Sequence, residues 1–391
     1  MRRTSSTWLF SIAALLVVST AAVGETHRPS LCLPHLFEEG MRLNDTAGIW
    51  VYWLELLLRQ HEVCWRAPQQ PDELRVFLYG NSAVFGYSLR PQDSFAYGLN
   101  ERFDRRRIPA HIFNLGFAMT YQLKDALIMR ASLTYQPDVI VYGVTLSDFE
   151  HVAPSPFFGI MQFFDVNRAL ALQFAAERPA GLEEPLEIYR SLLSMVSLEH
   201  SPAQQLWQLG AAIRAAAREH ARRIPGKTSP DLPDDPEWTA RRRTLRYDCG
   251  RIKEGIEQRF KDWQQWNILA YLKQLSDSTG VPVAIINWPV ANEPVDDCYN
   301  VRYTNAALAE YNQWLAEQAH AAGFAYIDLH DFLSPEDFVD SLHVAPRGHR
   351  KLAERLAPFL DTWLSHIASD RRTSPQTATD IPSRVSDGVQ R

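Results

Sequence analysis

Short apolar runs alternate along the chain with longer segments in which apolar residues recur every three or four positions. The runs lie at 76–79, 111–115, 138–143, 282–287 and 325–329, and their length and continuity are typical of buried parallel strands. The periodic segments lie at 120–135, 304–321 and 347–364 and predict helices, the last of them bent at Pro358. This alternation predicts an α/β fold, a three-layer sandwich with a five-stranded parallel sheet covered on both faces.

Two long regions fall outside the alternation. The N-terminal flank, 25–73, contains a helical pattern over 49–60, which we expect to pack on the sheet. Residues 150–262 separate the third strand from the fourth and predict a large, mostly helical insertion or lid. The core therefore falls into two halves, 74–149 and 263–367. The polar, aperiodic residues 368–391 predict a disordered tail.

Composition and the first residues narrow the classes of function. The chain has 391 residues, 46% of them hydrophobic, and its net charge of −6 gives no electrostatic reason to expect a nucleic-acid partner. Arg2 and Arg3 precede an apolar stretch at 8–23 that ends in small residues. This pattern predicts an export signal over 1–24, either cleaved or retained as a membrane anchor. We therefore expect an exported protein, periplasmic or secreted.

Four cysteines fit an oxidising compartment, where three pairings are possible. Proximity in the sequence favours Cys32–Cys64 and Cys249–Cys298. The spacing of these cysteines does not resemble a zinc site, and we expect no metal.

Polar residues follow the ends of the predicted strands. Ser82 follows the first strand, Gly116 the second and Ser147 the third, while Asp340 and His343 lie between the fifth strand and the last helix. Because the carboxyl ends of parallel strands meet at one edge of a sheet, we expect these residues to lie close together. A nucleophilic serine needs a base, here His343, and the base needs a group that fixes its tautomer, here Asp340. The backbone N–H groups of Ser82 and Gly116, with a side chain near residue 147, are candidate donors to a negative intermediate.

The order of these motifs resembles the SGNH (GDSL-type) hydrolase superfamily. The chain has Gly80-Asn81-Ser82, then Asn114-Leu115-Gly116, a third block that ends in Asp148, and Asp340-x-x-His343 before the closing helix. The resemblance covers roughly residues 74–366, although 150–262 have no counterpart in the minimal fold. It implies a flavodoxin-like sandwich with no cofactor. It also implies that Ser82 is the nucleophile, His343 the base and Asp340 the third member of the triad, with Gly116 donating to the oxyanion through its backbone.

Two positions depart from the family pattern. Asn81 stands where the first block usually has an aspartate, and it keeps the shape of that residue without its charge. Ser147 takes the place of the asparagine that supplies the side-chain oxyanion donor, with Thr145 as its substitute if the register of the loop differs. Loss of one such donor raises the barrier by about 3 kcal/mol, so reduced activity or an altered acceptor is one consequence of the change.

The resemblance implies a serine esterase that forms an acyl-enzyme and acts on O-acetyl or other short acyl groups of a carbohydrate, or on another small ester. One alternative is an exported polysaccharide O-acyltransferase with the same triad, supplied by a membrane acyl-donor protein. A second alternative is a binding protein that keeps the fold without catalysis.

Two further sets of residues are weaker candidates for the site. The residues after the fourth strand either line its mouth or form a proline-rich loop packed by its tryptophan: Asn287, Trp288 and Asn292. The aromatic residues of the insertion form either an apolar acyl wall or, as we favour, part of the insertion's own core: Phe157, Phe158, Phe163 and Phe164.

Overall fold

The structure is a computed structural model. It describes residues 54–70, 72–87, 89, 91–117, 121–149, 163–164, 167–183, 186, 267–294, 298–300 and 302–373. The predicted export signal and most of the predicted insertion lie outside these residues, as does the tail from 374 onward.

A five-stranded parallel sheet forms the centre of the molecule, which confirms the predicted fold class. Its strands are β1 (Leu74–Tyr79), β2 (Ala110–Asn114), β3 (Val139–Val144), β4 (Val283–Asn287) and β5 (Ala325–Asp328). They lie in the order β2-β1-β3-β4-β5, and every neighbouring pair is parallel. The predicted runs coincide with these strands, and β1, β3 and β4 are buried along almost their whole length, as an apolar run requires. The run at 325–329 was predicted to be buried as well, but β5 lies at the edge of the sheet, is only half-buried and ends in an exposed residue.

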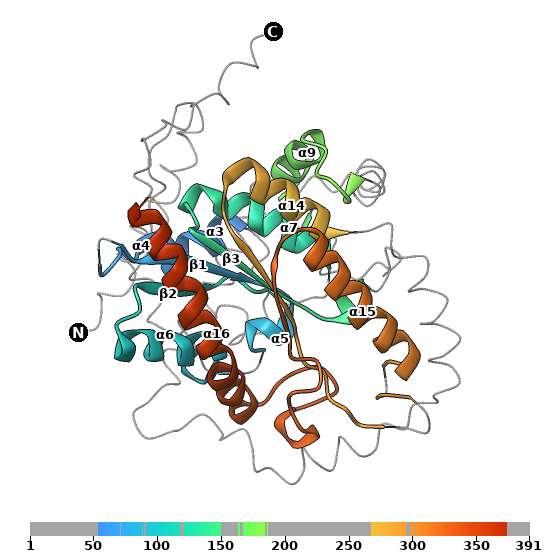
Figure 1. Ribbon diagram of the computed structural model, residues 1–391. Coiled ribbons are helices and arrows are strands. Elements are labelled where there is room, and N and C mark those ends of the chain that lie inside the picture. Colours follow the sequence, from blue (N-terminus) through green and yellow to red (C-terminus); the bar gives the residue numbers. More distant parts are fainter. Residues whose placement is uncertain are drawn as a thin grey trace, which may run out of the picture.

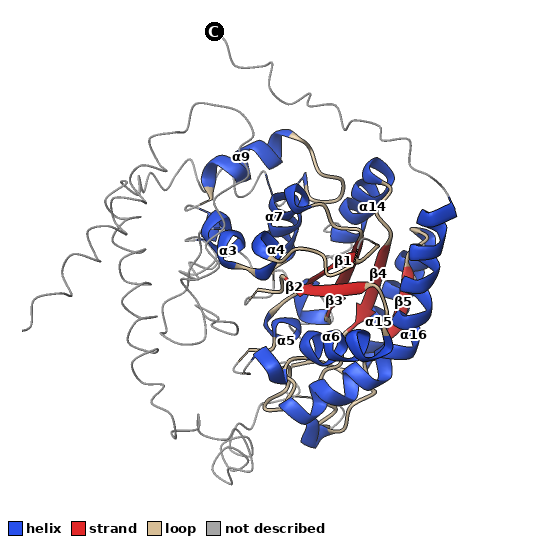
Figure 2. Ribbon diagram, turned by 90° about the vertical axis from the view of Figure 1, so that its left-hand side faces the viewer, coloured by secondary structure: helices blue, strands red, loops and turns tan. Residues whose placement is uncertain are grey.

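Helices cover both faces of the sheet. The connection from β1 to β2 contains α6 (Phe95–Arg106) and crosses the sheet in one direction. The later connections contain α7 (Gln122–Ser132), α14 (Ile268–Thr279) and α15 (Asn305–Ala321) and cross in the other direction. Because such crossovers are right-handed, α6 covers the face opposite to the other three helices. Figures 1 and 2 show α7 and α14 together on one side of the sheet and α6 beside the final helix on the other.

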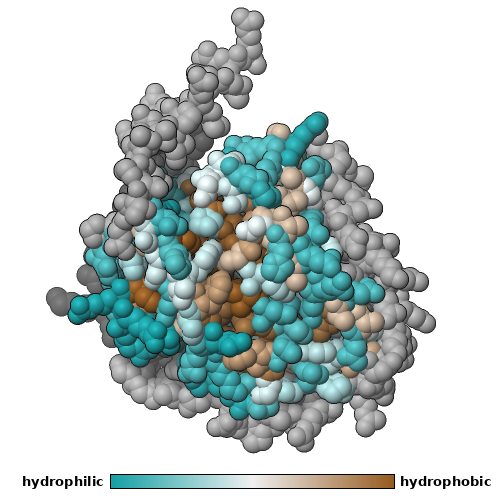
Figure 3. Space-filling model, viewed as in Figure 1, coloured by the Kyte–Doolittle hydropathy of each residue, from teal (hydrophilic) through white to brown (hydrophobic). Residues whose placement is uncertain are grey.

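The final helix, α16 (Pro346–Thr373), packs along α6 and continues through Pro358. Its apolar stripe consists of Leu352, Leu356, Leu360 and Leu364, all 0% exposed. The stripe extends to the buried Ala368, so the helix reaches beyond the predicted start of the disordered tail. On the face seen in Figure 3, hydrophilic residues lie on the outer sides of the helices and apolar residues show between them.

The N-terminal flank contributes α3 (Leu54–Gln60) and α4 (Glu62–Trp65). The α3 helix confirms the later part of the helix predicted at 49–60, and residues 49–53 lie outside the described part. Cys64 and Cys298 each form a disulfide bond. Cys32 and Cys249 are not described, so the predicted pairing is not tested. Among the helices that the structure describes, none is long and apolar enough to cross a membrane.

Candidate active site

A short helix carries Ser82 at the carboxyl end of β1. This helix, α5 (Ser82–Phe85), begins after Gly80, whose φ of 152° is rarely adopted by residues with a side chain. A Cβ on Gly80 would lie 2.6 Å from the carbonyl oxygen of Gly143, and one on Gly143 would lie 2.7 Å from the Val84 side chain. The two glycines therefore let α5 lie directly on the end of the sheet. Asn81 caps the helix by accepting the N–H of Ala83 at 2.8 Å.

The structure brings the three predicted triad residues together. The distance from His343 Nε2 to Ser82 Oγ is 2.8 Å, and that from His343 Nδ1 to Asp340 Oδ2 is 2.7 Å. An ionised Asp340 accepts the Nδ1 proton, which leaves a lone pair on Nε2 to accept the hydroxyl proton of Ser82. The motif residues thus form one chain of hydrogen bonds, although Ser82 and His343 are 261 positions apart in the sequence.

The loop that carries Asp340 and His343 is held by its own backbone. Asp340 Oδ1 accepts the N–H groups of Leu342 at 2.8 Å and His343 at 2.7 Å. Burial raises the pKa of Asp340, but its hydrogen bonds and its electrostatic interaction with His343 outweigh burial and lower the pKa to about 2. The Ala291 N–H also donates to the carbonyl oxygen of Ser341 at 3.1 Å. Asp340 is therefore ionised and fixed in the orientation that the base requires.

Of the two backbone N–H groups expected to stabilise an oxyanion, one already donates to a side chain and the other has no acceptor among the described residues. No described residue accepts the N–H of Ser82, the first residue of α5. The N–H of Gly116 donates to Asn114 Oδ1 at 3.1 Å, so an oxyanion must share this donor or displace the amide oxygen. The sequence placed Gly116 correctly at the end of β2, but it did not show that a side chain already occupies its N–H group.

The two hydroxyls considered as side-chain donors are turned into the interior. Thr145 Oγ1 accepts from Asn81 Nδ2 at 3.1 Å and donates to Asp148 Oδ2 at 3.0 Å. Because the single proton of Thr145 goes to Asp148, Ser147 must donate its own proton to Thr145 Oγ1, 2.7 Å away. Ser147 is 0% exposed and Thr145 only 1%. In this arrangement neither hydroxyl has a proton left for substrate, although the sequence predicted one of them as a donor.

Asp148 is the centre of this buried network. Its carboxylate lies 2.8 and 3.0 Å from Asn81 Nδ2 and accepts the N–H of Thr145 at 2.8 Å. Burial, and then the nearby charge of Asp125, raise its pKa to about 7, although these hydrogen bonds oppose the shift. The fully buried Lys124 lies 2.7 Å from Asp125, so one cation serves two carboxylates in this part of the core. The sequence identified Asn81 only as a variant of the family aspartate, and no pattern in it indicated that Asp148 would be its partner.

The weaker candidates lie mostly in the interior. Asn287 is 0% exposed, and its Nδ2 donates to Asn312 at 2.9 Å and to Asp328 at 3.0 Å, which joins the ends of β4 and β5 to α15. Trp288 is 1% exposed and packs edge-on against Phe95. Neither side chain lines an open mouth here, because both complete the packing at the end of β4. Only Asn292 of this set is exposed.

The two aromatic residues of the insertion that the structure describes are buried, as in the prediction that we favoured, but they join the core of the sheet domain rather than a core of the insertion. Phe163 and Phe164 are 0% and 1% exposed and pack on Phe117 and Tyr121. Phe157 and Phe158 lie outside the described residues.

One aromatic residue at the site was not predicted. The ring of Tyr87 lies 5.3 Å from that of His343, centroid to centroid, and the residue is 38% exposed. It follows Gly86, whose left-handed conformation ends α5. Its position depends on how the chain turns out of this short helix, which no motif in the sequence specifies. Within the described residues, no group of three or more His, Cys, Asp or Glu side chains is arranged to hold a metal ion.

No family model and no curated protein matches the chain. Among solved structures, it overlaps a psychrotrophic esterase, EstA, from Pseudoalteromonas sp., and Est24, a carbohydrate acetylesterase from Sinorhizobium meliloti. EstA is 9% identical with a TM-score of 0.38, and the match covers 75% of this chain and 100% of EstA. Est24 is 10% identical with a TM-score of 0.37, and the match covers 74% and 100%. Nothing about the chemistry of this chain follows from so low a similarity, so its activity has to be argued from its own side chains.

Proposed function

We propose that the protein is a serine esterase that cleaves ester-linked acyl groups through an acyl-enzyme on Ser82. The observation that carries the proposal is the hydrogen-bonded chain from Ser82 Oγ through His343 to Asp340, with distances of 2.8 and 2.7 Å. A nucleophile, a base within hydrogen-bond reach and a carboxylate that orients the base are the three parts that this chemistry needs.

The proposed reaction proceeds in two halves. Ser82 Oγ attacks the ester carbonyl carbon while its proton passes to His343 Nε2, and the resulting imidazolium is stabilised by Asp340. The oxyanion accepts from the Ser82 N–H and from the Gly116 N–H once Asn114 Oδ1 yields it. His343 then gives its proton to the departing alcohol, and the alcohol leaves as the acyl-enzyme forms. In the second half, water loses a proton to His343 and attacks the acyl carbon, which releases the carboxylic acid and returns the proton to Ser82.

We further propose that the alcohol part of the substrate is a carbohydrate. An aromatic ring presents a broad apolar face, and Tyr87 places such a face beside the base that protonates the leaving alcohol. The disulfides at Cys64 and Cys298 support a location in an oxidising compartment such as the periplasm or the cell exterior. In the transferase alternative, a membrane acyl-donor protein supplies the acyl group and a polysaccharide hydroxyl accepts it. This transfer would use the same steps, with that hydroxyl in place of water.

The test uses the purified full chain with p-nitrophenyl acetate and an alkyl fluorophosphonate. We expect a burst of nitrophenol, covalent labelling of Ser82, and loss of both in Ser82→Ala. If the unaltered protein neither turns over nor becomes labelled above the level of Ser82→Ala, the protein is not an esterase and the fold serves binding alone. In an active protein, faster loss of the acyl group to an added polysaccharide than to water identifies transfer as the main reaction.

A further inference from the structure

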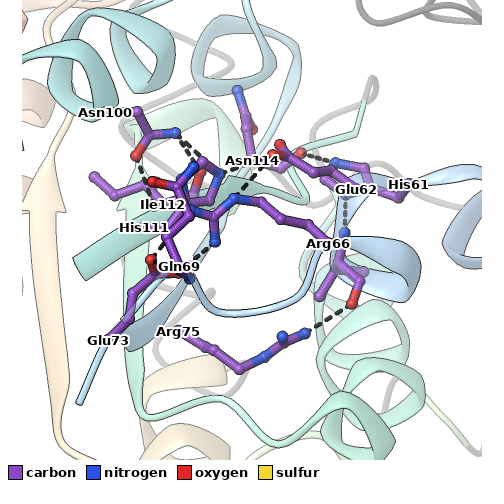
Figure 4. A network of polar contacts seen from close by, with 11 residues as sticks. His61, Glu62, Arg66, Gln69, Glu73, Arg75, Asn100, His111, Ile112 and Asn114 are labelled. Atoms are coloured by element: carbon purple, nitrogen blue, oxygen red, sulfur yellow. Dashed lines mark hydrogen bonds and ion pairs between the residues drawn. The ribbon is translucent and has the colours of Figure 1, made fainter. Parts of the chain in front are cut away.

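The N-terminal flank contacts the loop that follows β2 through one histidine. His61 caps α4, where its Nδ1 accepts the N–H of Val63 at 3.3 Å. The ring proton therefore lies on Nε2, which donates to the carbonyl oxygen of Asn114 at 2.8 Å. Figure 4 shows His61 reaching Asn114 from α4, with the rest of the flank's polar contacts around it. The family motifs begin at β1, so none of them includes this residue.

Asn114 connects the two parts of the proposed oxyanion site. Its Oδ1 accepts the N–H of Gly116, and its Nδ2 lies 3.3 Å from the carbonyl oxygens of both Val84 and Phe85. Val84 and Phe85 belong to α5, the helix that begins with Ser82. A shift in the backbone of Asn114 would therefore move the Gly116 donor relative to the nucleophile.

Within the described part of the chain, no strand pairs with the carbonyl of Asn114. β2 is the edge strand of the sheet, and Leu115 and Phe117 donate toward β1, to Leu78 and Gly80, at 2.8 and 2.9 Å. The carbonyl of Asn114 lies on the other side of the strand, where His61 donates to it. The peptide that leads from Asn114 to Gly116 is thus held on one side by the sheet and on the other by His61.

The position of His61 is itself fixed by contacts of α4 with the first two strands. Glu62 Oε1 lies 3.1 Å from His111 Nε2 on β2, and Arg75 of β1 donates to the carbonyl oxygen of Val63 at 2.7 Å (Figure 4). Arg75 and His111 are directly paired across the sheet. Cys64, in the same short helix, is disulfide-bonded. These contacts hold the His61 ring as a rigid part of the sheet edge.

We propose that His61 is a positioning residue for the esterase reaction: its hydrogen bond to Asn114 sets the direction in which Gly116 presents its N–H group to the oxyanion. This inference rests on the proposed function. It makes the N-terminal flank part of the catalytic unit, whereas the sequence indicated only a helix packed on the sheet. Misplacement of a catalytic group by about 1 Å can lower a rate by on the order of a hundredfold, so a modest relaxation of the loop is enough to be measured.

A second residue on the same strand edge provides a matched control. The side chain of Asn100 donates to the carbonyl of Ile112 at 2.9 Å and accepts its N–H at 2.7 Å. It satisfies the same edge of β2 two residues earlier and has no hydrogen bond to Asn114 within the described structure, although its Nδ2 also lies 3.4 Å from His111 Nε2. Asn100→Ala therefore reports the effect of losing a structural contact at this edge, and His61→Ala reports any additional effect on catalysis.

The experiment compares the full-length protein with His61→Ala, His61→Gln and Asn100→Ala. The measurements are kcat and KM with p-nitrophenyl acetate, the rate of Ser82 labelling by an alkyl fluorophosphonate, and the midpoint of thermal unfolding. For His61→Ala we expect kcat and the labelling rate to fall by about tenfold to a hundredfold, with KM within about twofold. His61→Gln offers an amide donor and should recover at least half of that loss on a logarithmic scale. Asn100→Ala should lower the midpoint but keep kcat within about twofold of the unaltered protein.

The outcomes separate this inference from the proposed function. An unaltered protein that is labelled and turns over, with His61→Ala no slower than Asn100→Ala, overturns the positioning role alone. The same conclusion follows if kcat in His61→Gln is as low as in His61→Ala while both variants unfold at the same temperature. An unaltered protein that is neither labelled nor active overturns the proposed esterase, and with it the role of His61.

Discussion

Asp148 lies in the core, hydrogen-bonded to the Asn81 side chain next to Ser82, and its replacement by asparagine tests the electrostatics of the site. Burial, and then the charge of Asp125, raise its pKa from 3.8 to about 7. Because the folded protein holds this proton more tightly than the unfolded chain, protonation of Asp148 favours the folded state. Its contribution to the free energy of unfolding is complete below about pH 4, and it is lost as the pH rises through about 7.

The size of this contribution follows from the shift of the pKa. A pKa raised from 3.8 to about 7 corresponds to roughly 4 kcal/mol, at about 1.4 kcal/mol for each tenfold change in proton affinity. Asp148 is only 3% exposed, so solvent screening reduces the figure little. This amount is a large fraction of the stability of an ordinary domain and lies well above the error of a denaturant titration.

The assay is urea unfolding of the unaltered protein and of Asp148→Asn at several values from about pH 4.5 to 8. The difference between the two free energies of unfolding cancels the titration of groups that do not interact with Asp148, such as Asp340. We expect the unaltered protein to lose several kcal/mol relative to the variant as the pH rises. A difference that stays constant within about 0.5 kcal/mol over this range would refute the reasoning, because Asp148 would then titrate alike in both states.

Three further predictions concern the same site. Asp340→Asn should lower kcat by about 10⁴-fold, because an amide does not hold His343 in the required tautomer; a loss below about tenfold in p-nitrophenyl acetate turnover would contradict the triad. Asn81→Asp places two buried carboxylates in contact and should lower both stability and kcat above neutral pH. Adding Asp148→Asn should restore an amide–carboxylate pair. A double variant that unfolds at a lower temperature than Asn81→Asp at pH 8 argues against this pairing. Ser147→Ala should keep kcat within about threefold, because the hydroxyl proton already serves a neighbouring side chain; a hundredfold loss would instead show that this hydroxyl donates to the oxyanion.

The fold could be predicted in detail because the sequence patterns that indicate its strands and helices are local. A strand buried on both faces needs a continuous apolar run, and Val76 to Tyr79 in β1 are all 0% exposed. The convergence of Ser82 with His343 could be predicted for a related reason, because parallel strands bring their carboxyl ends to one edge whatever the side chains are.

The remaining features of the site depend on tertiary contacts that leave no periodic pattern. The acceptor for the Gly116 N–H is a side chain two residues away, and the same side chain contacts carbonyl oxygens of α5, which is distant in the sequence. The backbone carbonyl of this residue accepts from His61, which is more distant still. The proton of Ser147 is committed to a neighbour only because Asp148 lies where it does. Because Asn287 ends the fourth strand, the sequence left open whether it lines the mouth of the site or belongs to a packed loop, and the burial of all of β4 takes it into the core.

The covered edge of β2 also affects how the protein behaves at high concentration. An edge strand with free backbone groups is a template onto which a strand of another molecule can add. Here the side chain of Asn100 occupies both outward groups of Ile112, and that of His61 occupies the outward carbonyl of Asn114. An incoming strand would have to displace both side chains before it could pair, so the contacts around the proposed oxyanion loop also reduce the tendency of this edge to aggregate.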